Sequence, residues 1–168
     1  MGIRHCLAGG IALVTLTACG VPITIEMVPL ERERATVVRT IDGDTIEVAL
    51  VPNGTRAKIR VLVIDSPERG DCGYKEAEQW VSNEFPIGTQ VRLEEDPQQD
   101  SIDRYERLLR YVYYTRNGVE LNLSLEEVRA GWARHYDKYP ASLSPEVESA
   151  EETARQKGRG LWGLCHIV

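Results

Sequence analysis

Three β-type segments separated by two turn sequences constrain the fold of this chain most strongly. Residues 36–40 and 45–51 are rich in β-branched side chains, and Asp42-Gly43-Asp44 lies between them. Because Asp and Gly favour tight turns, this pattern predicts an antiparallel pair of strands. After a second turn at Pro52-Asn53-Gly54, residues 57–64 are mostly apolar. That composition predicts a third strand that is buried on much of both faces, and so a three-stranded meander.

The remaining periodicity predicts two more strands and three helices. The further strands are expected at residues 89–94 and 108–115. Helical spacing of apolar residues and flanking Pro and Gly predict helices at residues 74–85, 121–130 and 145–157, with Gly131 as the C-cap of the second. Five strands with inserted and appended helices favour an α+β, mainly β domain. We expect a five-stranded Greek-key barrel of the oligonucleotide-binding (OB) type with three helices.

The first 18 residues have the pattern of a signal peptide. Arg4 precedes an apolar run over residues 6–16, which is too short to span a bilayer comfortably. The run ends in Leu16-Thr17-Ala18-Cys19, which is similar to the lipobox of bacterial lipoproteins, where the cysteine is acylated. An ordinary secretory signal is the alternative. We expect a signal peptide over residues 1–18, a tether over 19–34 and one folded domain over 35–168.

This arrangement predicts where the protein is located. Lipidation of Cys19 would make the membrane a partner through the lipid anchor, after secretion across the inner membrane. The protein would then be anchored to the cell envelope, at the outer membrane in a Gram-negative organism, because Gly20 and not Asp follows the cysteine.

The cysteine count agrees with export. Cys6 lies in the predicted signal peptide and Cys19 is the predicted lipid site, so Cys72 and Cys165 remain. In an oxidising compartment such a pair forms a disulfide by default, and the cysteine spacing does not suit zinc. Two unrelated free thiols are the alternative.

Acidic and basic residues also follow one another in a suggestive order. Asp42-Gly43-Asp44-Thr45 comes first, then Arg60, then Asp65-Ser66-Pro67-Glu68, and finally Asp103-Arg104-Tyr105-Glu106-Arg107. Phosphodiester hydrolysis needs both kinds of charge: oxygen ligands for a hard cation and planar guanidinium groups for phosphate. Each segment alone has a structural explanation, since acidic turns are common and an arginine on a strand can point into solvent.

The order and spacing of these motifs resemble the thermonuclease (staphylococcal nuclease) family. The resemblance covers residues 35–162 and includes the closing segment Gly158-Arg159-Gly160-Leu161-Trp162-Gly163. It implies an OB-type barrel and a calcium-dependent nuclease that hydrolyses DNA and RNA with low sequence specificity. The expected products are 3′-phosphorylated.

The resemblance also implies roles for individual residues. Asp44 and Asp65 would be carboxylate ligands of Ca²⁺, and the backbone carbonyl of Ser66 would be a further ligand. Glu68 would orient or deprotonate the attacking water. The catalytic arginines would be Arg60 and Arg107, whose guanidinium groups grip the phosphoryl oxygens.

Three tyrosines are candidates for contacts with a base or ribose: Tyr105, Tyr136 and Tyr139. Packing in the core or at the rim is an equally good explanation for each. The net charge of −6 opposes long-range attraction to nucleic acid. We therefore expect a single-stranded DNA or RNA substrate in preference to long duplex, and a monomeric protein.

One departure from the family pattern bears on activity. Glu106 stands where the family commonly has glycine, next to the second arginine. If the backbone there requires a positive φ, glutamate is strained. A catalytically weak or inactive OB-fold lipoprotein that binds nucleic acid or a protein is the alternative function. A structural envelope lipoprotein would leave the arginine positions unexplained.

Overall fold

The computed structural model describes residues 15–18, 21–24 and 33–165, and the chain divides into two units, Met1–Leu30 and Glu31–Val168. In the first unit, strand β1 (Thr15–Ala18) pairs antiparallel with β2 (Val21–Thr24). Cys19 and most of the predicted signal peptide lie outside the described residues. Among the residues that are described, no helix is long and apolar enough to cross a membrane.

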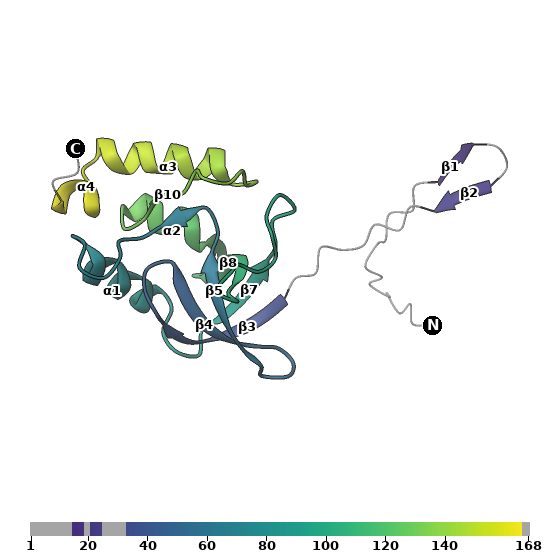
Figure 1. Ribbon diagram of the computed structural model, residues 1–168, viewed down its shortest axis with the longest axis horizontal. Helices are drawn as coiled ribbons and strands as arrows, with labels where there is room; N and C mark the ends of the chain where they lie inside the picture. Colours follow the sequence, from purple (N-terminus) through teal and green to yellow (C-terminus); the bar gives the residue numbers. More distant parts are fainter. Residues whose placement is uncertain (1–14, 19–20, 25–32, 166–168) are drawn as a thin grey trace, which may run out of the picture. The chain divides into compact units, whose positions relative to one another are not determined.

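The second unit is built on a closed barrel of five strands (Figure 1). These strands are β3 (Glu33–Thr40), β4 (Thr45–Leu50), β5 (Arg56–Val61), β7 (Gln90–Glu94) and β8 (Leu108–Arg116). The order around the barrel is β5-β4-β3-β7-β8, and a parallel pairing between β5 and β8 closes it. Strand β9 (Val119–Asn122) extends β8 as a hairpin. The predicted mainly β, OB-type fold is confirmed.

Three helices of more than one turn accompany the barrel: α1 (Tyr74–Glu84), α2 (Leu123–Ala130) and α3 (Ser144–Gln156). A single turn, α4 (Leu161–Leu164), follows. The prediction placed the start of α2 two residues early. Asn122 caps the helix by accepting a hydrogen bond from the Leu125 amide at 3.2 Å, and the residues before it pair with β8. Gly131 ends the helix with a φ of 82°, as predicted.

The prediction of one continuous strand over residues 57–64 is wrong. Strand β5 ends at Val61, and Val63 has a φ of 63°. Contacts from distant segments impose this bend, because the Tyr136 amide donates to the Val63 carbonyl and the Ser124 hydroxyl donates to the Leu62 carbonyl, both at 2.9 Å. After the bend, β6 (Ile64–Asp65) pairs with β10 (Arg134–His135).

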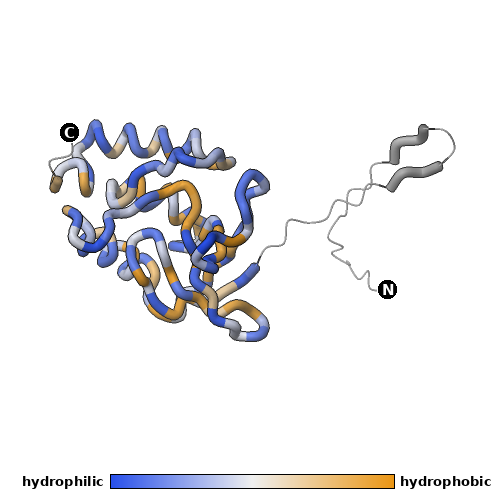
Figure 2. The backbone as a smooth tube through the Cα atoms, viewed as in Figure 1, coloured by the Kyte–Doolittle hydropathy of each residue, from blue (hydrophilic) through white to orange (hydrophobic). Residues whose placement is uncertain are grey.

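Side chains of the barrel strands form the core together with apolar side chains of α1, α2 and α3. Figure 2 shows hydrophobic residues concentrated along the strands, whereas α3 is largely hydrophilic along its length. The fully buried core side chains are mostly β-branched or leucine, among them Val37, Ile46, Val48, Ile59, Val61, Ile64, Leu93 and Leu123. Burying one such side chain contributes about 1.5–3 kcal/mol, so this rigid core fixes the strand ends that carry the acidic and basic motifs.

Strand pairing brings the three motifs together at one region of the barrel. Thr45 on β4 lies directly opposite Arg60 on β5, and Arg60 lies opposite Leu109 on β8. The loop that precedes β8 closes on itself, since the Asp103 amide donates to the Arg107 carbonyl at 2.9 Å. The turn before β4, the end of β5 and the start of β8 are therefore neighbours.

A disulfide between Cys72 and Cys165 connects the segment before α1 with the end of α4, across 93 residues of sequence. The two cysteines that the sequence paired are thus bonded in the structure. The bond lies four residues beyond Glu68 and holds one end of the loop that carries this residue.

Candidate functional site

Arg60 lies between the two predicted metal-binding carboxylates. Its Nη2 is 3.2 Å from Asp44 Oδ2 and 3.4 Å from Asp65 Oδ1. Its Nη1 donates to the carbonyls of Val61 at 2.7 Å and Ile64 at 2.8 Å. These carbonyls flank the bend in the chain, so the bend itself creates the pocket for the guanidinium. Only 14% of the Arg60 side chain is exposed.

Arg107 is held by a second set of contacts. Its Nε donates to Asp103 Oδ2 at 2.8 Å, and its backbone amide donates to Asp103 Oδ1 at 2.9 Å. Its Nη1 donates to the Thr45 hydroxyl at 3.3 Å, which in turn donates to Asp44 Oδ1 at 3.0 Å. A continuous hydrogen-bond network therefore joins Arg107 through Thr45 to Asp44. The motif alone assigned no role to Asp103, which fixes this arginine.

The turn that carries Asp44 packs closely against Ser66. The Ser66 amide donates to Asp44 Oδ2 at 3.2 Å. A side chain on Gly43 would have its Cβ 2.5 Å from the Ser66 Cβ, so glycine is required there for space. Both Asp44 and Ser66 are buried, whereas Asp65 is half exposed. The structure thus brings together Asp44, Asp65 and Ser66, the three residues that the family resemblance implies as metal ligands.

The acidic groups of this site disfavour one another's charged forms. Burial, together with the charge on Asp44, raises the pKa of Asp42 to about 6. Burial and the same charge raise the pKa of Asp65. Burial acts to raise the pKa of Asp103, but hydrogen bonds from Arg107 outweigh it and lower this pKa overall. A cation placed among Asp42, Asp44 and Asp65 would relieve this repulsion.

A further carboxyl of the region, that of Glu127 on α2, was not predicted from the sequence. It is fully buried, and burial, with the charge on Asp44, raises its pKa well above the ordinary value. Its sequence position was a usable signal, because it lies four residues after the buried Leu123 and next to the buried Val128 on the inward face of the helix. A glutamate on the buried face of a helix is unusual, because glutamate is rarely fully buried unless it is paired.

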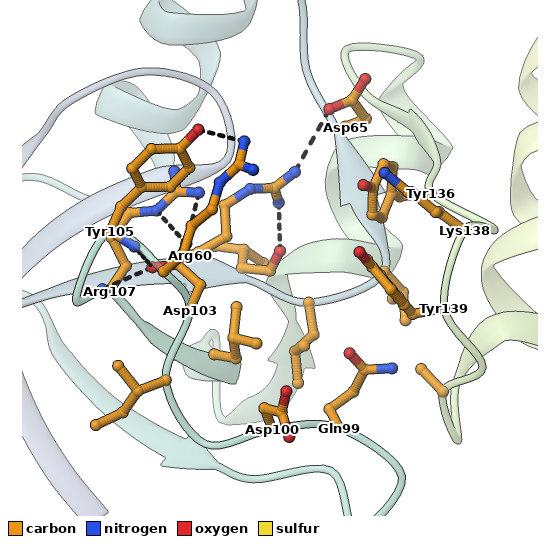
Figure 3. A pocket seen from close by; sticks show the side chains of 17 residues that line it. Arg60, Asp65, Gln99, Asp100, Asp103, Tyr105, Arg107, Tyr136, Lys138 and Tyr139 are labelled. Atoms are coloured by element: carbon orange, nitrogen blue, oxygen red, sulfur yellow. Dashed lines mark hydrogen bonds and ion pairs between the residues drawn. The ribbon is translucent and has the colours of Figure 1, made fainter.

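A pocket of about 420 Å³ opens beside the two arginines (Figure 3). All three predicted tyrosines line it with Arg60, Asp65 and Arg107. The rings of Tyr136 and Tyr139 are 6.1 Å apart, and the Arg60 guanidinium is 5.8 Å from the Tyr136 ring. Tyr105, which is 62% exposed, lies 5.5 Å from the Arg107 guanidinium. The pocket therefore presents positive charge and aromatic faces together.

Glu68 is placed differently from the other predicted residues. It lies on an exposed loop after β6, where its amide donates to Asp71 Oδ2 at 3.1 Å. Its side chain is not among those that line the pocket in the described part of the chain.

The described residues contain no group of three or more His, Cys, Asp or Glu side chains that could hold a metal ion. The chemistry of the donors nevertheless fits a hard cation. Asp44 and Asp65 direct one oxygen each toward the same positively charged nitrogen of Arg60. Calcium accepts irregular oxygen ligation, so two carboxylates supplemented by a carbonyl, water and substrate oxygens are sufficient.

Glu106 adopts a φ of 62°, within the left-handed region. The condition under which glutamate is strained at this position, a positive φ, is therefore met. The exposed glutamate is therefore strained beside Arg107, where glycine would not be.

Comparison with known proteins identifies the family. The family model described as Staphylococcal nuclease homologue matches residues 58–163. An uncharacterized endonuclease of Haemophilus influenzae is 33% identical over 132 residues, which cover 79% of this chain and 67% of the relative. The micrococcal nuclease of Shigella flexneri is 28% identical over 161 residues, which cover 93% and 88% respectively. An uncharacterized endonuclease of Escherichia coli is 35% identical over 127 residues, which cover 75% and 74%.

The matched region includes the three predicted catalytic residues, Arg60, Glu68 and Arg107, and two of the three predicted metal ligands, Asp65 and Ser66. It spans more than half of the chain and agrees with the closed OB-type barrel. The resemblance drawn from the motifs is thereby confirmed, and the chain belongs to the staphylococcal nuclease family.

Proposed function

We propose that this protein is a Ca²⁺-dependent nuclease that hydrolyses DNA and RNA with low sequence specificity and leaves 3′-phosphorylated products. Family membership supports the nuclease function. The main observation behind the proposal is that the guanidinium groups of Arg60 and Arg107 line one pocket. The carboxylates of Asp44 and Asp65 lie beside it, both directed toward Arg60. This arrangement places hydrogen-bond donors for a phosphate next to carboxylate ligands for a cation.

The proposed mechanism assigns each side chain a task. Asp44, Asp65 and the Ser66 carbonyl would hold the Ca²⁺ ion, which would supply a Lewis acid that polarises the phosphoryl group. Arg60 and Arg107 donate hydrogen bonds to the phosphoryl oxygens and stabilise the charge that develops there. Glu68 orients the attacking water or accepts its proton. Water oxygen bonds to phosphorus as the bond to O5′ breaks, and the leaving oxygen takes up a proton.

The pocket favours a single strand as substrate. Three tyrosine rings can stack on unstacked bases, which a closed duplex does not present, while the two arginines contact the phosphates. The negative net charge of the chain weakens binding to long duplex further.

We propose that the protein acts as a monomer, anchored to the cell envelope by a lipid on Cys19.

Substitution of the proposed catalytic groups tests the mechanism. Arg107→Ala and Glu68→Gln should each lower kcat for single-stranded DNA by about 10²–10³-fold, because each removes a group that acts on the transition state. Arg155→Ala and Glu148→Gln make the same chemical changes on the exposed part of α3 and serve as controls that retain activity. Undiminished hydrolysis by both site variants would refute these assignments. Binding of DNA without hydrolysis by the wild-type protein would favour a binding function.

A further inference from the structure

Glu127 is a buried acid without a partner. Its exposed fraction is 0%, and neither carboxylate oxygen has a hydrogen-bond partner among the described residues. Burying a carboxylate in this way is costly unless another group compensates for it. An apolar residue would fit the inward face of α2 at lower cost, so a purely structural role does not explain the acid.

The side chain points from the interior toward the acidic turn of the proposed metal site. A Cβ on Gly43 would lie 3.0 Å from Glu127 Oε1, which places this oxygen directly behind the turn. The charged groups that act on Glu127 are Asp44, Arg60 and Asp42, all of which belong to the site. Two of these three are themselves acidic, and the one cation, Arg60, is already shared between Asp44 and Asp65.

We propose that Glu127 is a positioning carboxylate of the divalent-cation site, which strengthens cation binding from behind the Asp42–Asp44 turn. The inference rests on the proposed function, since it assumes that Asp44 and Asp65 bind the cation. A carboxylate in a medium of low dielectric attracts a nearby divalent ion more strongly than one in water does. Because Glu127 is enclosed, it contributes this attraction without contacting the nucleic acid.

Calorimetric titration of the purified protein with Ca²⁺, in the absence of nucleic acid, tests the inference. Glu127→Gln preserves the shape of the side chain, and Glu127→Leu replaces it with an apolar one. Both should weaken Ca²⁺ binding by about tenfold or more. Glu126→Gln is the matched control: this neighbouring glutamate is paired with Arg129 at 2.6 Å, and its loss should leave the affinity unchanged.

Thermal melting separates this role from a structural one. Without Ca²⁺, Glu127→Leu should melt at a higher temperature than the wild type, because an uncompensated buried acid is removed. With Ca²⁺, both variants should show a smaller rise in Tm than the wild type. Equal Ca²⁺ affinity of the wild type and Glu127→Gln would overturn this inference alone. A wild-type protein that takes up no Ca²⁺, or whose uptake survives Asp44→Asn, would overturn the proposed metal site as well.

Discussion

Glu106 shows how one residue can limit both stability and activity. Its φ of 62° costs an L-residue about 1 kcal/mol, and it directly precedes in the chain the arginine that we propose binds phosphate. Glu106→Gly should raise the free energy of unfolding by up to about 1 kcal/mol and speed hydrolysis severalfold. Denaturant unfolding and kinetics on single-stranded DNA measure the two effects.

Asn117→Gly is the control for this substitution. Asn117 also has a positive φ, 53°, but asparagine tolerates that conformation and the residue lies in the β8–β9 hairpin. The control should gain less stability and leave the rate unchanged. A Glu106→Gly variant that is less stable than the wild type would show that strain does not dominate at this position.

Asp96 links two elements that form one side of the pocket. Its carboxylate accepts hydrogen bonds from the Tyr111 hydroxyl and the Ser142 amide, both at 2.6 Å. The loop after β7 and the segment before α3 are thereby held together, and both line the pocket through Gln99 and Ala141. Asp96→Asn should cost about 2 kcal/mol in unfolding free energy and raise KM for single-stranded DNA.

The same contact predicts a pH dependence. Although burial acts to raise it, hydrogen bonds from Tyr111 and Ser142 lower the pKa of Asp96 below 3.8. The stabilisation is therefore fully present above about pH 4 and is lost as the pH falls through the lowered pKa. The stability difference between wild type and Asp96→Asn should be constant from pH 5 to 7 and shrink below about pH 4. A difference that grows on acidification would contradict the sign of this shift.

At the scale of the whole molecule, local sequence determined most of the barrel. Strand and helix positions followed from residue periodicity and turn chemistry, as for the capping of α2 by Gly131. The bend at Val63 could not be predicted, because bonds from Ser124 and Tyr136 hold a β-branched residue at positive φ. The burial of Glu127 and the place of Arg60 between two carboxylates likewise depend on how distant strands meet.

The central claim concerns the molecule as a catalyst: the proposed cation and phosphate sites act together in nuclease activity. The most direct measurement is the rate at which the wild-type protein hydrolyses single-stranded DNA with Ca²⁺ and with an excess of chelator. Our account predicts 3′-phosphorylated fragments with Ca²⁺ and a loss of at least about 10²-fold in rate with chelator, because the ion supplies several kcal/mol of charge stabilisation. An equal rate under both conditions would contradict the account.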